Sequence, residues 1–184
     1  MPNPDADTIT DLVRGSRGPH VVLLCGTTGS GKTTLGRRLE HTLPAVRFNV
    51  DDWMIALFGQ HMPRAVFDER FALIQGRLWD VTERLLALGV HVVLDYGFWR
   101  RGERIAAARK ARAAGATPLL VYLDAPRPVL EQRLARRNAD LPTGTYEITR
   151  DMLGTFAAHL EPPQSDEGLR LITIRAGNDE VATP

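Results

Sequence analysis

The sequence holds one cysteine, Cys25, and only two lysines, Lys32 and Lys110, among 23 basic residues. A single cysteine excludes an internal disulfide framework. The scarcity of lysine means that nearly every other cationic contact must come from arginine, whose planar fork suits phosphate binding. The formal net charge of +1 argues against overall electrostatic attraction to nucleic acid or to an anionic membrane. No apolar run approaches the roughly 18 residues of a membrane span. Residues 1–5 lack a secretory signal pattern, so we expect a cytoplasmic protein without membrane association.

A length of 184 residues indicates one domain with a sizeable core. Residues 1–19 are polar and predict a short N-terminal extension, before a core over 20–175 and a frayed tail over 176–184. Apolar runs predict strands at 20–25, 45–50, 91–95, 118–124 and 169–174, and helical patterns lie at 32–42, 65–88, 102–114, 127–138 and 146–159. Because strands alternate with helices and the inner strands are continuously apolar, we predict a three-layer α/β domain with a parallel sheet covered on both faces.

The first predicted strand runs directly into a complete phosphate-binding loop pattern, also called Walker A, and a helix follows at once. The glycines of this pattern let backbone N–H groups point inward at phosphate oxygens, and the helix adds its positive N-terminal end. Lys32 can reach the terminal phosphates, and Thr33 can hold Mg²⁺. The residues expected to bind the nucleotide are Gly26, Thr27, Thr28, Gly29, Ser30, Gly31, Lys32, Thr33 and Thr34.

Acidic residues lie where the next two predicted strands end. Asp51 and Asp52 follow the second strand, and Asp95 ends the third. A carboxylate at this edge could accept the proton of an acceptor hydroxyl, so we assign Asp51 as general base and Asp52 as a helix cap or a ligand of a magnesium-bound water. Asp95 could hold Mg²⁺, directly or through water, or it could begin an ordinary turn. The predicted metal-binding residues are therefore Thr33, Asp95 and Asp52.

Arginines of a late helix offer further positive charge. Arg133, Arg136 and Arg137 are spaced i, i+3 and i+4, so they share one helix face. Such a cluster can neutralise a transferring phosphoryl group, or it can form a solvated face. We expect Arg133 and Arg137 to act in catalysis together with Lys32 and Asp51.

Aromatic and basic residues near the carboxyl ends of the strands could form a pocket for an acceptor molecule. The aromatic residues concerned are Trp53, Phe58, Tyr96, Phe98 and Trp99, which either line such a pocket or belong to the core. Arg100, Arg101 and Arg104 either bind an anionic acceptor or face solvent. The predicted substrate-binding residues are Asp51, Trp53, Tyr96, Trp99 and Arg100.

Four segments together resemble the P-loop kinase family with an adenylate-kinase-like core, which is often classed among AAA-family ATPases. The segments are the phosphate loop, Asn49-Val50-Asp51-Asp52, Val93-Leu94-Asp95, and Leu123-Asp124-Ala125-Pro126 followed by Arg133. The family includes the kinase domain of phage polynucleotide 5′-kinase, chloramphenicol phosphotransferase, zeta toxins and gluconate kinase. The resemblance spans residues 20–175 and implies a five-stranded parallel sheet with the first strand central.

The resemblance also implies roles for individual residues. It implies Asp51 as the base and a small helical lid over about 133–145 with a nucleotide-binding arginine, which falls on Arg133, with Arg137 as the second candidate. It also implies an adenine contact near 176–178. Polynucleotide kinases of this type carry an arginine three residues after the base. This chain has Met54 there, which disfavours a polynucleotide acceptor.

We therefore expect a kinase that uses ATP and Mg²⁺ to transfer the γ-phosphoryl group to a hydroxyl of a small molecule, such as a metabolite, an antibiotic or a nucleotide sugar. One alternative is a polynucleotide 5′-hydroxyl kinase, whose acceptor would be a nucleic acid. Another is a nucleotide-binding regulatory ATPase with little transfer activity. The protein is expected to be a monomer or a homodimer.

Overall fold

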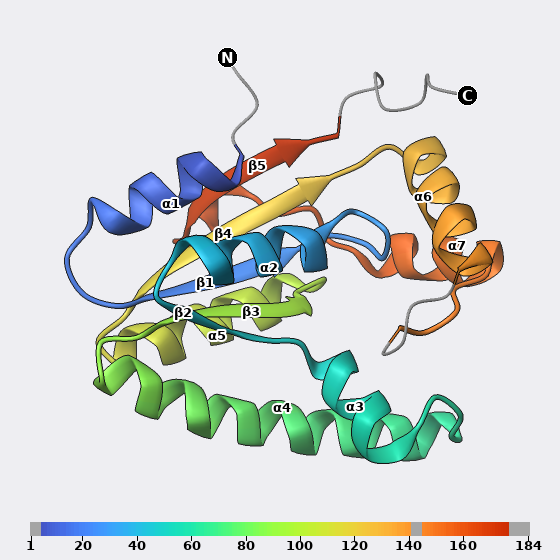
Figure 1. Cartoon of the computed structure of the whole chain (residues 1–184), viewed down its shortest axis with the longest axis horizontal. Coiled ribbons are helices and arrows are strands. Elements are labelled where there is room, and N and C mark those ends of the chain that lie inside the picture. The colour runs from blue at the N-terminus through green and yellow to red at the C-terminus, as the bar shows by residue number, and fades with distance from the viewer. Residues whose placement is uncertain (1–4, 141–144, 177–184) are drawn as a thin grey trace.

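The computed structural model describes residues 5–140 and 145–176. In this part of the chain, five strands form one parallel sheet in the order β2-β3-β1-β4-β5 (Figure 1). The strands are β1 (His20–Cys25), β2 (Ala45–Phe48), β3 (His91–Gly97), β4 (Thr117–Asp124) and β5 (Arg170–Arg175). The first strand is central and all six of its residues are buried. The predicted fold class, including the central position of the first strand, is confirmed.

Helices cover both faces of the sheet and its carboxyl edge (Figure 1). One face carries α1 (Ala6–Arg14) and α2 (Lys32–Thr42), and the other carries α4 (Arg64–Ala87) and α5 (Arg101–Ala113). Beyond the carboxyl ends of the strands lie α3 (Val50–Phe58), α6 (Arg127–Ala139) and α7 (Arg150–His159). A short 3₁₀ helix, η1 (Ser165–Glu167), precedes the last strand.

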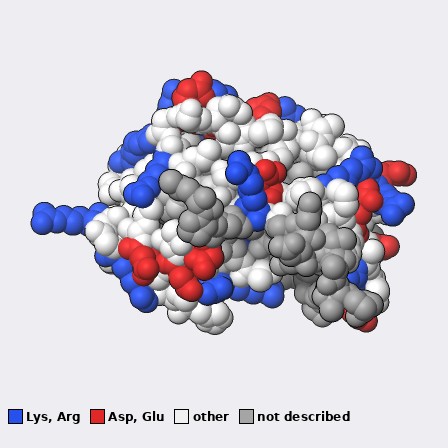
Figure 2. All heavy atoms as spheres, turned by 90° about the horizontal axis from the view of Figure 1, so that it is seen from above, with Lys and Arg blue, Asp and Glu red and all other residues white. Residues whose placement is uncertain are grey.

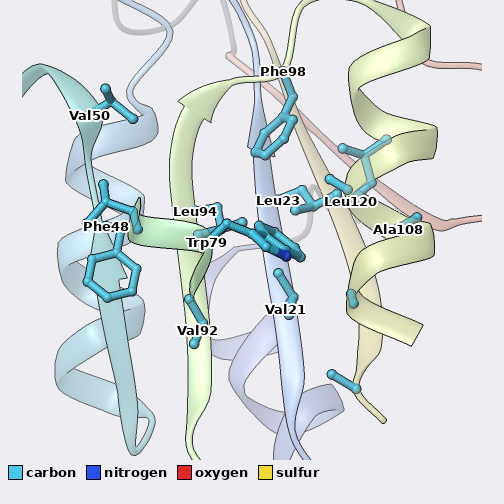
Figure 3. Close-up of a cluster of buried hydrophobic side chains, with 14 of the residues drawn as sticks. Val21, Leu23, Phe48, Val50, Trp79, Val92, Leu94, Phe98, Ala108 and Leu120 are labelled. Atoms are coloured by element: carbon cyan, nitrogen blue, oxygen red, sulfur yellow. The ribbon is translucent and has the colours of Figure 1, made fainter. Parts of the chain in front are cut away.

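Alternation along β1 divides the core between the two faces, because successive strand side chains point in opposite directions. Val21 and Leu23 pack with α4 and α5, whereas Val22 and Leu24 pack with α1 and α2. Figure 3 shows the Trp79 ring of α4 lying against the first of these faces. Continuous apolar strands are therefore required at the centre of the sheet, as the sequence predicted.

Several boundaries differ from the sequence predictions. Strand β2 ends at Phe48 rather than residue 50, because Asn49 is the N-cap of α3 and accepts a hydrogen bond from the backbone N–H of Asp52. Strand β3 continues past Asp95 to Gly97, and α7 begins at Arg150 rather than 146. Asp51 and Asp52 therefore lie in the first turn of a helix and not at the end of a strand.

The segment before β1 is more than an extension. Its helix α1 buries Ile9 and Val13 completely or nearly so against α2, and Thr10 shares a hydrogen bond with Thr42. Part of the expected lid over 133–145 is helical, as the end of α6, whereas residues 141–144 lie outside the described residues. Residues 177–184 also lie outside the described residues. They include most of the expected adenine contact near 176–178 and of the expected tail over 176–184.

The described surface carries both signs of charge. Figure 2 shows basic and acidic side chains intermingled over the visible face, where neither sign forms a continuous stripe. Within the described residues, 5–140 and 145–176, no helix combines the length and the apolar character needed to cross a bilayer.

Candidate active site

The phosphate loop joins β1 to α2 at the carboxyl edge of the sheet. Gly26 has φ of 147°, and a Cβ atom there would lie only 2.7 Å from Ser30 Oγ and 2.8 Å from the Leu123 carbonyl oxygen. Gly31 has φ of 103° and is the N-cap of α2. Gly26 is required because a Cβ atom would clash, and Gly31 is required because its backbone is left-handed. The helix α2 then begins directly at Lys32.

The Lys32 side chain lies across this loop. Its Nζ donates to the carbonyl oxygens of Gly26 and Thr27, both at 2.9 Å. Burial lowers the pKa of Lys32, while the negative charges of Asp95 and Asp51 oppose that shift. A lysine held in this way, among nearby carboxylates, presents a compact positive charge at the loop.

A cavity of about 250 Å³ opens beside the loop. It brings together loop residues with carboxylates of α3 and β3. Its lining residues are Thr28, Gly29, Gly31, Lys32, Thr33, Thr34, Asn49, Asp51, Asp95, Tyr96, Gly97, Trp99 and Arg137.

Asp51 contributes a carboxylate to this cavity from the first turn of α3. Desolvation by the surrounding protein raises the pKa of Asp51 to about 6, and the negative charge of Asp95 adds to this effect. The positive charge of Lys32 opposes it. The residue is nonetheless exposed at its surface, so the carboxylate is accessible to an acceptor. This combination suits a general base.

Asp52 does not line the cavity, and it is not the helix cap that the sequence suggested, since Asn49 caps α3. Its carboxylate instead accepts a hydrogen bond from Arg47 Nη2 at 2.9 Å. Arg47 Nη1 also donates to Asp95 at 3.2 Å, and the Arg47 side chain is only 10% exposed. Sequence reasoning missed Arg47, although an arginine within the short strand Val46-Arg47-Phe48 was a usable signal.

Asp95 lies within β3, with its side chain 1% exposed. Together with Thr33 it supplies oxygen donors to the cavity, and oxygen donors fit Mg²⁺. The described residues hold no cluster of three or more His, Cys, Asp or Glu that could bind a metal by itself.

The arginines of α6 separate into different environments. Arg137 lines the cavity and donates to the Tyr146 carbonyl oxygen at 3.2 Å, and burial lowers its pKa while the charge of Asp51 opposes the shift. Arg133 Nη1 donates to the Ser30 carbonyl oxygen of the phosphate loop at 3.2 Å. Arg136 is exposed. Two of the three arginines therefore approach the site.

Trp99 links the loop after β3 to the phosphate loop. Its Nε1 donates to the Gly26 carbonyl oxygen at 2.9 Å, and its ring packs on Phe156 of α7 at 5.1 Å between centroids. Tyr96 also lines the cavity, with its ring stacked on the buried Phe98. Both residues were predicted to contact substrate, and both reach the cavity wall.

Other predicted contacts are not brought to this cavity. Trp53 is 46% exposed and does not line it, and Phe58 lies under the guanidinium of Arg70. Arg100 is largely exposed, at 3.9 Å from Glu161. Neither alternative offered for Arg104, anion binding or solvation, is correct. Its side chain is fully buried, and Glu167 balances its charge inside the protein.

Comparisons with known proteins place this geometry in a family. A family model described as an AAA domain matches residues 21–163. The fold is similar to that of a protein from Chloroflexus aurantiacus provisionally described as a kinase, with TM-score 0.68, 19% identity, and coverage of 91% of this chain and 93% of that one.

Two further solved structures share the fold. A sugar kinase from Janibacter has TM-score 0.62 and 18% identity, and the match covers 90% of each chain. A chain of the Pnkp1/Rnl/Hen1 RNA repair complex has TM-score 0.62 and 20% identity, and the match covers 79% of this chain and 45% of that one. No curated protein sequence matches the chain.

Proposed function

The chain belongs to the AAA domain family and has the P-loop NTPase fold, and on that premise we propose that it is a Mg²⁺- and ATP-dependent kinase that phosphorylates a hydroxyl group of a small molecule. One observation carries the proposal. Asp51, whose pKa is raised to about 6, lines the same cavity as Lys32 and Thr33. A base with a pKa near neutrality beside a phosphate loop suits in-line phosphoryl transfer to a hydroxyl.

The residues divide the chemistry among them. Asp51 accepts the proton of the acceptor hydroxyl while that oxygen forms a bond to the γ-phosphorus, and the bond from this phosphorus to the β,γ-bridging oxygen breaks to release ADP. Lys32 and the loop N–H groups bind the β- and γ-phosphates, and Arg137 and Arg133 offset charge that develops in the transition state. Thr33 and Asp95 would hold Mg²⁺, which neutralises phosphate charge when bound.

The cavity supports a small acceptor better than a polynucleotide. A kinase that binds a polynucleotide acceptor needs a basic stripe and aromatic rings that are free to stack on bases. Arg104 is buried, Arg101 pairs with Asp166 at 2.7 Å, and the Trp99 ring packs against the protein. Met54 is fully buried in the core, so that position offers no cation to the cavity.

The test is a mass-spectrometric screen for phosphate gain. The protein is incubated with ATP, Mg²⁺ and a panel of hydroxyl compounds that includes 5′-hydroxyl oligonucleotides. We expect turnover on a small hydroxyl compound that Asp51→Asn lowers at least a hundredfold, within the range of general-base effects. Asp68→Asn is the control and should retain most activity, because Asp68 is an exposed carboxylate of α4 outside the cavity. Turnover on oligonucleotides alone, or an Asp51→Asn variant as active as the parent, would overturn the proposal.

A further inference from the structure

A buried arginine connects three elements beside the cavity. Arg47 of β2 donates to Asp95 of β3 at 3.2 Å and to Asp52 of α3 at 2.9 Å, and its Nε lies 3.8 Å from Glu40 of α2. Its side chain is 10% exposed. A guanidinium can meet several carboxylates at once because its five N–H donors form a rigid planar fork, which a lysine ammonium lacks.

The helix beside Arg47 is shaped to admit it. A Cβ atom at Gly36 of α2 would lie 2.9 Å from Arg47 Cδ and 3.2 Å from Leu24 Cδ1. Glycine is unfavourable inside a helix by roughly 1 kcal/mol relative to alanine, so its presence here needs a packing reason. The space that it leaves holds the stem of Arg47, which directs the guanidinium toward the carboxyl edge of the sheet.

The hydrogen bonds to Asp95 are uneven. Arg47 Nη1 and Asn49 Nδ2 both donate to Oδ2, at 3.2 and 2.8 Å. In the described part of the chain, no donor bonds to Oδ1. Since Asp95 lines the cavity, one oxygen is anchored to the protein and the other is left for what binds there. Asp52, held by the same guanidinium, is kept from the cavity that Asp51 lines.

The geometry points to Arg47 as a positioning residue of the nucleotide site, which orients Asp95 toward the magnesium–nucleotide complex and holds Asp52 away from it. This inference rests on the proposed function, because it assumes that Thr33 and Asp95 hold Mg²⁺. Partners that orient a metal-binding carboxylate typically change metal affinity about 10- to 100-fold when they are replaced. Arg47 should therefore affect the magnesium-dependent part of nucleotide binding and leave the contacts of the phosphate loop intact.

The experiment measures ADP binding to the full chain by calorimetry, once with Mg²⁺ and once with EDTA. In the parent, Mg²⁺ should strengthen ADP binding. We expect Arg47→Lys and Arg47→Met to reduce this strengthening about tenfold, while affinity in EDTA changes less than about twofold. Arg38→Met is the control, since Arg38 pairs with Asp7 at the exposed surface and should leave both affinities unchanged. Asp95→Asn combined with Arg47→Lys should cost little more than either change alone, because both act through one carboxylate.

Thermal unfolding separates this role from a structural one. If Arg47→Lys lowers the melting temperature but leaves the Mg²⁺ dependence of ADP binding at the parent value, Arg47 only stabilises the fold and the inference is wrong. If Arg47→Met does not fold, Arg47→Lys still decides the question. A parent chain that binds no ADP would refute the proposed function itself, and that result is visible before any variant is compared.

Discussion

Replacing Glu167 by glutamine should destabilise the protein severely, because Glu167 is the counter-charge of a fully buried arginine. Arg104 of α5 is 0% exposed, and its Nε and Nη2 donate to Glu167 at 2.7 and 2.6 Å. Its Nη1 donates to the carbonyl oxygens of Phe98, Trp99 and Glu161 at 2.9 to 3.1 Å. Glutamine would remove the negative charge and would turn an N–H group toward the guanidinium.

The size of the effect follows from burial. Breaking a buried ion pair on one side costs about 3–5 kcal/mol, since the remaining buried charge loses its counter-charge. Against a total stability of about 5–15 kcal/mol, this is a large fraction. For a chain of this length, 1 kcal/mol corresponds to a shift in melting temperature of about 2–4 °C, so we expect Glu167→Gln to melt about 6–20 °C below the parent.

Urea unfolding followed by tryptophan fluorescence measures the free energy, and calorimetry measures the melting temperature. Asp68→Asn is the control. Asp68 pairs with Arg64 on α4, but the two side chains are 55% and 77% exposed, so the loss should stay below about 0.5 kcal/mol. A Glu167→Gln variant that loses less than about 1 kcal/mol, or no more than Asp68→Asn, would refute the reasoning from burial.

Three further outcomes follow from the site and the sheet. Lys32→Ala should weaken ADP–Mg²⁺ binding at least tenfold in calorimetry, because charge-assisted contacts to phosphate are lost, and unchanged affinity would contradict the loop assignment. Phosphoryl transfer should fall about tenfold for each pH unit below 6, because Asp51 must be ionised to accept a proton, and a flat rate profile down to pH 5 would count against it as base. Burial lowers the pKa of both His20 and His91, so the unfolded chain binds more protons. The contribution of these two neutral histidines to the free energy of unfolding should be fully present above pH 6.5 and should decline below it. Urea unfolding should therefore show that the free energy of unfolding falls less between pH 7.5 and pH 5.5 for His91→Gln than for the parent.

Local patterns predicted the parts of the fold that local forces determine. The bounds of α2 were predicted residue for residue, because the phosphate loop defines where the helix begins and Pro44 limits where it ends. The end of β2 was misplaced, because Asn49, Asp51 and Asp52 are all favourable capping residues and sequence alone does not rank them. The extended backbone of Asn49 and the hydrogen bond that its side chain accepts from the Asp52 N–H identify the cap.

Pairings between distant charges could not be predicted in this way. Arg47 meets Asp95 across 48 positions, and Arg104 meets Glu167 across 63. The place of Arg47 inside a short strand is a signal of burial, but nothing in the sequence identifies Asp95 or Glu167 as the partner of either arginine. What distinguishes them is the packing of several elements around each guanidinium, which the parallel topology creates only when the sheet is assembled.

Arg104 makes contacts near the carboxyl edge that a lysine could not make. A lysine ammonium is a point charge, whereas the Arg104 guanidinium bonds one carboxylate and three carbonyl oxygens at once. One of those carbonyls belongs to Trp99, whose indole donates to the Gly26 carbonyl oxygen, the same atom that accepts from Lys32. A buried ion pair far along the chain is thereby connected, by successive hydrogen bonds, to the lysine of the phosphate loop. Glu167→Gln should therefore weaken nucleotide binding as well as lower stability, even though Glu167 lines no part of the cavity.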